Sequence, residues 1–259
     1  MRFDADDEMN KFFKALGSLM VLAAYLGGSQ IRAQQRIVSA KVTVTPGAAK
    51  DGSKTSGSIA TDTSNVAIWL VPLDPAGVAV PVSSRLPNAP QLLQRNKTFE
   101  PHVLIVPLGT MVEFPNQDPF FHNIFSLYDG RRFDLGLYES GTKRSVKFDR
   151  PGVSFLFCNI HAEMSAVVLS VDTPYFALSD RSGNVTIRNV PDGRYQMHVW
   201  YERSAPEQLQ EFTRVVIISD SSRNLGLLHL VEMPNFTLAH KNKYGLDYVP
   251  PPNPDYDRR

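Results

Sequence analysis

The single cysteine of the chain, Cys158, stands in a group of side chains that can bind a metal. His161 and Met164 follow it at regular spacing in the segment CNIHAEM. Upstream, His122 comes after a separate apolar stretch. Two imidazoles, one thiolate and one more distant thioether are the donors of a blue-copper centre. The pattern therefore predicts that His122, Cys158 and His161 bind one copper ion strongly and that Met164 is the weak axial ligand.

The same side chains also have a purely structural interpretation. Cysteine and methionine are often buried as apolar side chains, and the two histidines could be unrelated to them. For any one of these residues alone, the structural interpretation is preferred. The combination of C-x-x-H-x-x-M after an apolar run with H-N after V-x-F-x-N-x-D favours the copper site.

The segments that would position these ligands are predicted to be β-strands. Short apolar or alternating runs recur along the chain and are separated by turns that contain Pro, Gly and Asp, as at 149–152. No long pattern of helical period lies among them. Many short strands with turns between them predict an all-β fold built of β-sandwiches. The ligands would then come from strand ends at one pole of a sandwich, where a rigid scaffold presents its loops.

Residues 65–171 resemble the plastocyanin-type cupredoxins, and the spacing from Cys158 to Met164 matches the short ligand loop of amicyanins. The segments that carry the likeness are 99–109, 112–118, 122–123, 133–136, 151–152 and 158–164. The resemblance implies a Greek-key β-sandwich with one type 1 copper ion bound by His122, Cys158, His161 and Met164. It also implies that Asn123 hydrogen-bonds the cysteine sulfur and joins the two ligand loops. Without the resemblance, Asn123 would be a strand-end residue that satisfies nearby backbone groups.

A second, smaller β domain is predicted over residues 172–232. Its sequence DRSGNVTIRNVPDGRY contains two turn motifs between alternating runs and is similar to carboxypeptidase regulatory-like domains, which are transthyretin-like sandwiches. This likeness implies a fold and no activity. Residues 36–64 are expected to form an N-terminal strand and a linker. Residues 233–259 are expected to be a Pro-rich tail that is largely extended or disordered.

Residues 1–35 have the parts of a secretory signal peptide. Lys11 and Lys14 precede an apolar run over 15–26, and small or polar residues follow it. The alternative is an uncleaved membrane anchor, but the run is shorter than the roughly 20 residues that cross a bilayer. We therefore expect an exported protein, periplasmic or associated with the cell surface, whose only membrane contact would be this segment if it is not cleaved.

The composition excludes several kinds of function. A formal net charge of +1 and the absence of an arginine-rich stripe give no basis for nucleic-acid binding. A single cysteine excludes an internal disulfide, a Cys-x-x-Cys redox pair and a dinuclear copper centre with two thiolates. The copper centres that consume oxygen or nitrite use His-x-His pairs, which this sequence lacks. We therefore do not expect catalytic turnover by this chain alone.

The function that these patterns favour is an exported one-electron carrier between redox partners. The resemblance implies that the ring of His161 lies near the surface in an apolar patch, which could include Phe120 and Phe121, and that a partner protein would dock there. Two alternatives stay open: a copper-binding or delivery module, and a metal-free interaction protein that keeps only its β scaffolds. The role of His102, at the start of an apolar run, is also left open.

Overall fold

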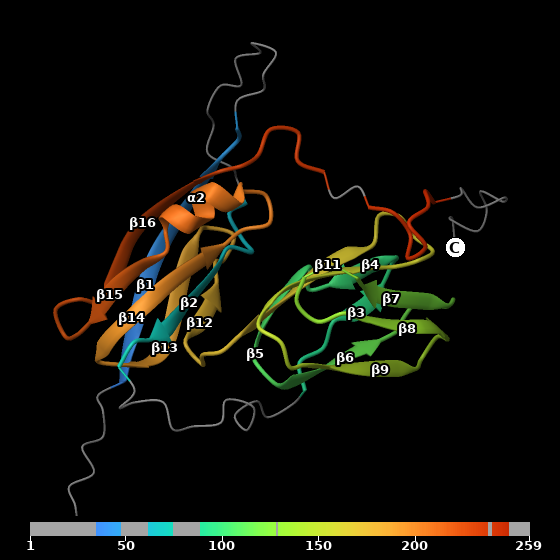
Figure 1. Ribbon diagram of the computed structural model, residues 1–259, viewed down its shortest axis with the longest axis horizontal. Coiled ribbons are helices and arrows are strands. Elements are labelled where there is room, and N and C mark those ends of the chain that lie inside the picture. Colours follow the sequence, from blue (N-terminus) through green and yellow to red (C-terminus); the bar gives the residue numbers. More distant parts are fainter. Residues whose placement is uncertain (1–34, 48–61, 75–88, 128, 238–239, 249–259) are drawn as a thin grey trace, which may run out of the picture. The chain divides into compact units, whose positions relative to one another are not determined.

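The computed structural model describes residues 35–47, 62–74, 89–127, 129–237 and 240–248. Its described residues form sixteen β-strands and one short helix, which confirms the predicted all-β class (Figure 1). The predicted signal peptide lies almost wholly outside the described residues. Among the helical residues that the structure describes, none belongs to a helix that is long and apolar enough to cross a membrane.

The strands that carry the predicted ligands form one sandwich, called here the first sandwich. Its main sheet has the order β5-β11-β10-β7-β8, and it is completed by the pairs β6-β9 and β3-β4. In the main sheet β5 runs parallel to β11, and the other pairs are antiparallel. Its strands are β3 (Leu93–Arg95), β4 (Thr98–Glu100), β5 (Val103–Pro107), β6 (Thr110–Pro115), β7 (His122–Ser126), β8 (Phe133–Tyr138), β9 (Lys143–Phe148), β10 (Gly152–Phe157) and β11 (Ser165–Val171).

The core of the first sandwich follows from strands whose side chains alternate between its two faces. On β6, Val112 and Phe114 are fully buried, whereas Met111, the residue before Val112, is exposed. They pack in one cluster with Ile124 of β7 and Leu156 of β10, which come from the main sheet. Successive side chains of a strand point to opposite faces, so this period of two sends one face inward.

The remaining strands form a second sandwich. Its two sheets have the orders β13-β1-β16 and β12-β2-β14-β15. Its elements are β1 (Gln35–Thr45), β2 (Ala67–Pro72), β12 (Phe176–Leu178), β13 (Asn184–Pro191), β14 (Gly193–Trp200), α2 (Pro206–Glu211), β15 (Arg214–Ile218) and β16 (Asn224–Val231).

Strand pairing differs from the domain limits expected from the sequence. β1, expected as part of a separate N-terminal segment over 36–64, pairs antiparallel with β13 and parallel with β16. β2, expected within the 65–171 unit, pairs with β12 and β14. A strand's own residues predict that it is a strand, but they do not identify partners that lie more than a hundred residues away. The first sandwich is therefore placed in the chain between β2 and β12 of the second.

Residues of both sandwiches meet in a small apolar cluster. Val103, Val167 and Leu169 of the first sandwich are buried together with Ala67 of β2, and Trp200 of β14 packs against them.

Candidate metal centre

The four predicted ligands are buried at one end of the first sandwich. His122 is the first residue of β7, and Cys158 follows the last residue of β10. Because β7 and β10 are antiparallel neighbours, the start of one strand lies beside the end of the other. His161 and Met164 follow in the loop between β10 and β11. The exposed fraction is 7% for His161 and 0% for the other three side chains.

The sulfur of Cys158 faces one nitrogen of each imidazole. Its Sγ lies 3.7 Å from Nδ1 of His122 and 3.6 Å from Nδ1 of His161. The two rings meet at a tilt of 61°, with their centroids 4.9 Å apart. The candidate ligand atoms of His122, Cys158 and His161 all lie within 4.8 Å of one another. The structure therefore brings together the three side chains that the sequence predicted as strong ligands.

These separations fit a single small metal ion. A first-row ion such as zinc binds imidazole nitrogen at about 2.0–2.1 Å and thiolate sulfur at about 2.3 Å. At angles between tetrahedral and trigonal, these bond lengths place nitrogen and sulfur roughly 3.5–3.8 Å apart. The observed S···N separations of 3.6 and 3.7 Å lie in this interval. A soft thiolate with two imidazoles and a nearby thioether is the donor set that suits copper.

The ligand loop is closed by its own backbone. The N–H of Cys158 donates to the carbonyl of Met164 at 3.1 Å, and the N–H of Met164 donates to the carbonyl of His161 at 3.2 Å. These two bonds fold the seven-residue segment so that Cys158, His161 and Met164 lie close together. Met164 is fully buried in the same apolar cluster as Cys158.

Asp118 determines which nitrogen of His122 faces the sulfur. Its Oδ2 lies 2.7 Å from Nε2 of His122, and both side chains are buried. The imidazole therefore donates its Nε2–H to the carboxylate and turns Nδ1 toward Cys158. Metal-binding histidines usually donate their other N–H in this way, which fixes the ring and raises its basicity as a ligand. Sequence reasoning assigned no role to Asp118, although it lies in the quoted motif four residues before His122.

Asp118 is itself held by the turn between β3 and β4. Its two oxygens accept the backbone N–H groups of Asn96 at 2.6 Å and Lys97 at 3.0 Å. Both turn residues have positive φ, at 53° and 56°. Burial acts to raise the pKa of Asp118, but these N–H groups and His122 outweigh it, so the pKa lies below its ordinary value. The carboxylate is therefore ionised and able to accept from His122.

The protonation states of the ligands suit metal binding. Burial lowers the pKa of His122 against the opposing effect of Asp118, which keeps the ring neutral. Burial raises the pKa of the Cys158 thiol, although backbone N–H groups of Asn123, Ile160 and His161 oppose it. Without a cation the buried sulfur therefore keeps its proton. A bound metal ion would release that proton, because coordinating thiols are deprotonated.

Asn123 contacts both the sulfur and the neighbouring strand. Its backbone group is directed at Cys158, where it acts to lower the thiol pKa. Its side-chain Nδ2 donates to Oδ1 of Asp134 on β8 at 2.7 Å. The same carboxylate oxygen accepts the N–H of Gly136 at 2.9 Å, and Oδ2 pairs with Lys243 at 2.7 Å. Asn123 thus links the sulfur to β8.

Two adjacent phenylalanines border the site in different ways. The ring of Phe120 lies 5.2 Å from the ring of His122 and 5.6 Å from that of His161, between centroids. Phe120 is half-buried, whereas Phe121 is 53% exposed. Ile160, in the ligand loop, is 40% exposed. Exposed apolar side chains therefore stand next to His122 and His161 in the chain, and Phe120 contacts both rings.

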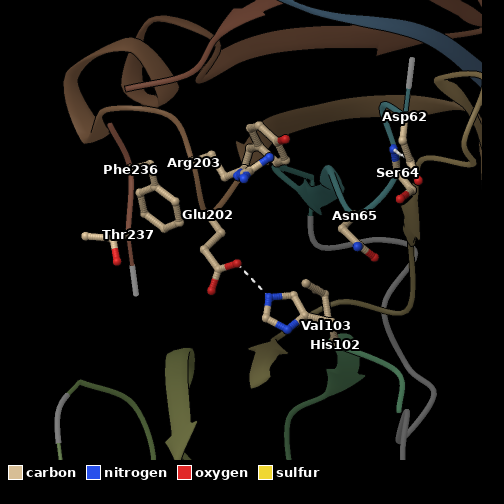
Figure 2. A pocket seen from close by; sticks show the side chains of 10 residues that line it. Asp62, Ser64, Asn65, His102, Val103, Glu202, Arg203, Phe236 and Thr237 are labelled. Atoms are coloured by element: carbon tan, nitrogen blue, oxygen red, sulfur yellow. Dashed lines mark hydrogen bonds and ion pairs between the residues drawn. The ribbon is translucent and has the colours of Figure 1, made fainter. Parts of the chain in front are cut away.

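His102 lies away from the cluster. Its Nε2 is 2.6 Å from Oε2 of Glu202, and its Nδ1 contacts the carbonyl of Ser165 at 3.2 Å. Figure 2 shows the pair at the edge of a cavity of about 440 Å³, which is also lined by Arg203 and Phe236. His102 therefore joins the two sandwiches through an ion pair and takes no part in the candidate metal centre.

Comparisons with known proteins give partial structural likenesses. No family model and no curated protein matches the chain. A purple cupredoxin from Nitrosopumilus maritimus overlaps 32% of this chain and 99% of its own, with 24% identity and a TM-score of 0.30. A single-residue mutant of amicyanin in the Cu(I) form overlaps 40% of this chain and 98% of its own, with 17% identity and a TM-score of 0.31.

A third solved structure is a copper-containing nitrite reductase from Thermus scotoductus. It overlaps 40% of this chain with 28% identity and a TM-score of 0.33, and the overlap covers 28% of the reductase. The chain thus spans less than a third of that enzyme. At TM-scores of this size, overlap alone assigns neither a fold nor a function. The residues and distances of the centre itself carry the assignment of a candidate copper site.

Proposed function

We propose that the protein is a mononuclear type 1 copper protein that carries single electrons between redox partners. The observation that carries the proposal is the buried Cys158 sulfur with Nδ1 atoms of His122 and His161 at 3.7 and 3.6 Å. Met164, buried in the same cluster, is assigned as the axial ligand. The centre contains one thiolate and two imidazoles, which supports a single ion per chain.

The protein's own residues would keep the centre nearly unchanged between redox states. Copper, when bound, would supply a one-electron couple between its cupric and cuprous forms. Asp118 holds His122 in one orientation, and the two backbone bonds of the ligand loop hold Cys158 and Met164. Burial excludes water from the ligands. A rigid, dry donor set lowers the reorganisation that an electron transfer requires.

We infer that the redox partner docks on the apolar surface around Phe121 and Ile160. These two side chains are 53% and 40% exposed. Phe120, the residue before Phe121, has its ring 5.2 Å from that of His122 and 5.6 Å from that of His161, which supports a docking site close to His161. Exposed apolar side chains above a buried redox centre support brief docking, as in small transient interfaces.

We also propose that the protein is exported, as the pattern of residues 1–35 predicts. A secretory signal would be removed on export and would leave a shorter mature chain. Intact mass of the protein recovered from a periplasmic or surface fraction tests this proposal. Recovery of the full-length mass from a membrane pellet would instead support an uncleaved anchor.

Copper titration of the purified protein tests the main proposal. We expect one equivalent of Cu(II) to produce an intense thiolate-to-copper visible band, a paramagnetic spectrum with narrow hyperfine splitting, and a reversible one-electron wave. Cys158→Ser is the matched control, because it keeps a similar side-chain volume and removes the thiolate. This variant should fold in the absence of metal and should show neither the colour nor tight binding.

The same titration distinguishes the alternatives. Metal that binds only the native state must stabilise it, by about 2.7 kcal/mol at a hundredfold excess over the dissociation constant. An unchanged melting temperature on addition of copper would indicate a metal-free interaction protein. Tight Cu(I) binding with transfer to an acceptor, but without fast electron self-exchange, would indicate a delivery module.

A further inference from the structure

Residues 240–248, called here the C-terminal segment, lie against the ligand loop. The hydroxyl of Tyr248 donates to the carbonyl oxygen of Cys158 at 2.6 Å. The backbone N–H of Lys243 donates to Oδ1 of Asn159, the next residue of the loop, at 2.9 Å. The sequence predicted an extended or disordered tail from residue 233. In these residues the structure shows specific contacts with the loop that carries three of the four candidate ligands.

A second set of contacts joins the segment to the other side of the centre. The ammonium group of Lys243 pairs with Oδ2 of Asp134 at 2.7 Å, and its side chain is 21% exposed. Oδ1 of the same carboxylate accepts from Asn123, whose backbone is directed at the Cys158 sulfur. Lys243 therefore contacts the ligand loop through its backbone and Asp134 of β8 through its side chain, and Asp134 in turn binds Asn123 of β7.

An aromatic contact completes the attachment. The ring of His240 packs on the ring of Phe157, the residue before Cys158, with centroids 4.0 Å apart. Nδ1 of His240 lies 3.1 Å from the hydroxyl of Tyr248. Since that hydroxyl donates its one proton to the Cys158 carbonyl, its oxygen is left to accept from His240. The hydroxyl is therefore bonded on both sides, which gives it a defined direction.

The segment also has local structure of its own. Oδ1 of Asn242 accepts the backbone N–H groups of Tyr244 and Leu246, at 2.9 and 3.1 Å. Backbone bonds join Asn242 with Leu246 and with Gly245. This turn contains Lys243 and ends two residues before Tyr248. Less conformational freedom is then lost when the segment attaches.

We propose that the C-terminal segment is an intramolecular brace of the metal centre, with Tyr248 and Lys243 as its positioning residues. Bonds to Cys158 and Asn159 hold the first half of the ligand loop, and the bond to Asp134 holds the strand opposite. The effect of the brace on copper-site geometry rests on the proposed function. The contacts between the segment and the loop do not require a bound metal. If the attached segment raises metal affinity by some factor, bound metal must strengthen the attachment of the segment by the same factor, because coupling is reciprocal.

Thiol labelling of the metal-free, full-length protein tests the brace directly. Cys158 is the only cysteine and is fully buried, so its reaction with a thiol reagent reports opening of the ligand loop. We expect Tyr248→Phe to increase the labelling rate about fivefold, since loss of its one hydrogen bond to the ligand loop corresponds to a factor of this size. The double variant with Lys243→Met and Tyr248→Phe should be labelled more than about tenfold faster than wild type.

Two control variants separate bracing from a general change in the segment. Leu246 is 63% exposed, so Leu246→Ala should label at the wild-type rate. Lys243→Arg keeps a cation for Asp134 and should restore most of the protection that Lys243→Met removes. If the double variant does not fold, as judged by near-ultraviolet circular dichroism, the single Tyr248→Phe variant decides the question, because it removes only one hydroxyl.

A second measurement tests positioning of the ligands. In Cu(II)-loaded protein, Tyr248→Phe should shift the thiolate-to-copper band and the reduction potential, whereas Leu246→Ala should change neither. Labelling of Tyr248→Phe at the wild-type rate in metal-free protein would overturn the brace. Labelling needs no metal, so it tests the brace independently of copper. If Tyr248→Phe raises the labelling rate but the copper-loaded protein gives no blue-copper spectrum, the brace stands and only the proposed function is refuted.

Discussion

At the scale of single residues, the orientation of His122 is decided by a group that never touches the sulfur. Asp118 accepts the Nε2 proton of His122 and leaves Nδ1 toward Cys158. Two backbone N–H groups of the β3–β4 turn hold the carboxylate in place. The direction of one ligand therefore depends on a hairpin that lies about twenty residues earlier in the chain.

The Asp118→Asn variant tests this dependence. An amide at this position can still accept from His122, but it lacks the charge and can also turn its NH₂ group toward the ring. We expect copper affinity to fall by about 10–100-fold, as is usual when a group that orients a metal ligand is changed. Competition with a chelator of known affinity measures the change.

Glu113→Gln is the control for Asp118→Asn. It makes the same chemical change in a carboxylate that pairs with Lys143 on the sheet pair β6-β9. Copper affinity should stay at the wild-type value in this variant. Equal affinity losses in both variants would mean that Asp118 acts through general charge or stability and not through His122.

Met164 is tested by two substitutions with opposite expected effects. Leucine conserves volume in a fully buried position and should cost less than about 1.5 kcal/mol of stability. It offers no donor, so the reduction potential should rise. Glutamine offers a harder oxygen donor that favours Cu(II), so Met164→Gln should lower the potential. Cyclic voltammetry measures both, and an unchanged potential in the two variants would show that Met164 is not an axial ligand.

Residue types and spacing predicted the three side chains that the structure brings together, His122, Cys158 and His161. Cys158, His161 and Met164 lie within seven positions, and the antiparallel pairing of β7 with β10 brings His122 to them. The partner of His122 could not be predicted in the same way. Carboxylates are common in loops, and only the folded path of residues 116–121 brings Asp118 back to the ring.

At the scale of elements, the metal centre depends on the ends of two strands and on the turns beside them. The sequences of β6, β10 and β11 alternate or are continuously apolar, which is the pattern from which short strands are predicted. The strand pattern is weaker in β8, where Gly136 lies at a φ of 66° and the next residue, Leu137, is 60% exposed. The strands β3 and β4 have three residues each, which is too short for a periodic pattern.

Gly130, in the turn between β7 and β8, is expected to be intolerant of a side chain. Its φ is +72°, and a Cβ there would lie 2.5 Å from Oγ of Ser154 and 2.7 Å from the carbonyl oxygen of Val153. Gly130→Ala should cost about 2–4 kcal/mol, from positive φ together with overpacking against β10. Chemical denaturation measures the free energy of unfolding.

Gly141 provides the matched comparison for Gly130. Its φ is +75°, and nothing lies within 4 Å of a Cβ at that position. Gly141→Ala should therefore cost only about 1–2 kcal/mol, from backbone conformation alone. If the two variants lose the same stability, contact with β10 does not contribute at Gly130.

At the scale of the whole molecule, the two sandwiches are joined by apolar packing and by the pair His102–Glu202. Glu202 is 9% exposed and His102 is 36% exposed at the side chain. The hydrogen bond with Glu202 raises the pKa of His102, against burial and the charge of Arg203. The sequence identified His102 only as a histidine at the start of a strand, because its partner lies a hundred residues later.

This pair predicts a pH dependence of stability. The raised pKa means that the protonated ring is favoured in the folded protein, so the contribution is complete below the unfolded pKa of about 6.5. It is lost as the pH rises through the higher folded pKa. Wild type should have a higher free energy of unfolding than His102→Gln, and this difference should be larger at about pH 5.5 than at about pH 9. The difference should change by about 1 kcal/mol or less between the two pH values, because the ring is partly exposed to water.

Guanidinium denaturation at the two pH values measures this difference. Glu202→Gln should abolish the same pH-dependent part, because it removes the charge that favours the protonated ring. A stability difference between wild type and His102→Gln that is equal at both pH values would show that the contact contributes through packing and not through charge.

The placement of the first sandwich between β2 and β12 has a consequence for synthesis on the ribosome. β1 ends at Thr45 and its neighbour β13 begins at Asn184, so about 140 residues are translated between them. At about 5–20 residues per second this takes roughly 7–30 s. All strands of the candidate copper unit emerge within that interval, whereas the early strands of the other sandwich wait for partners. The strands of the first sandwich are therefore synthesised together, and the exposed edges of β1 and β2 are the points at which slow translation would favour aggregation.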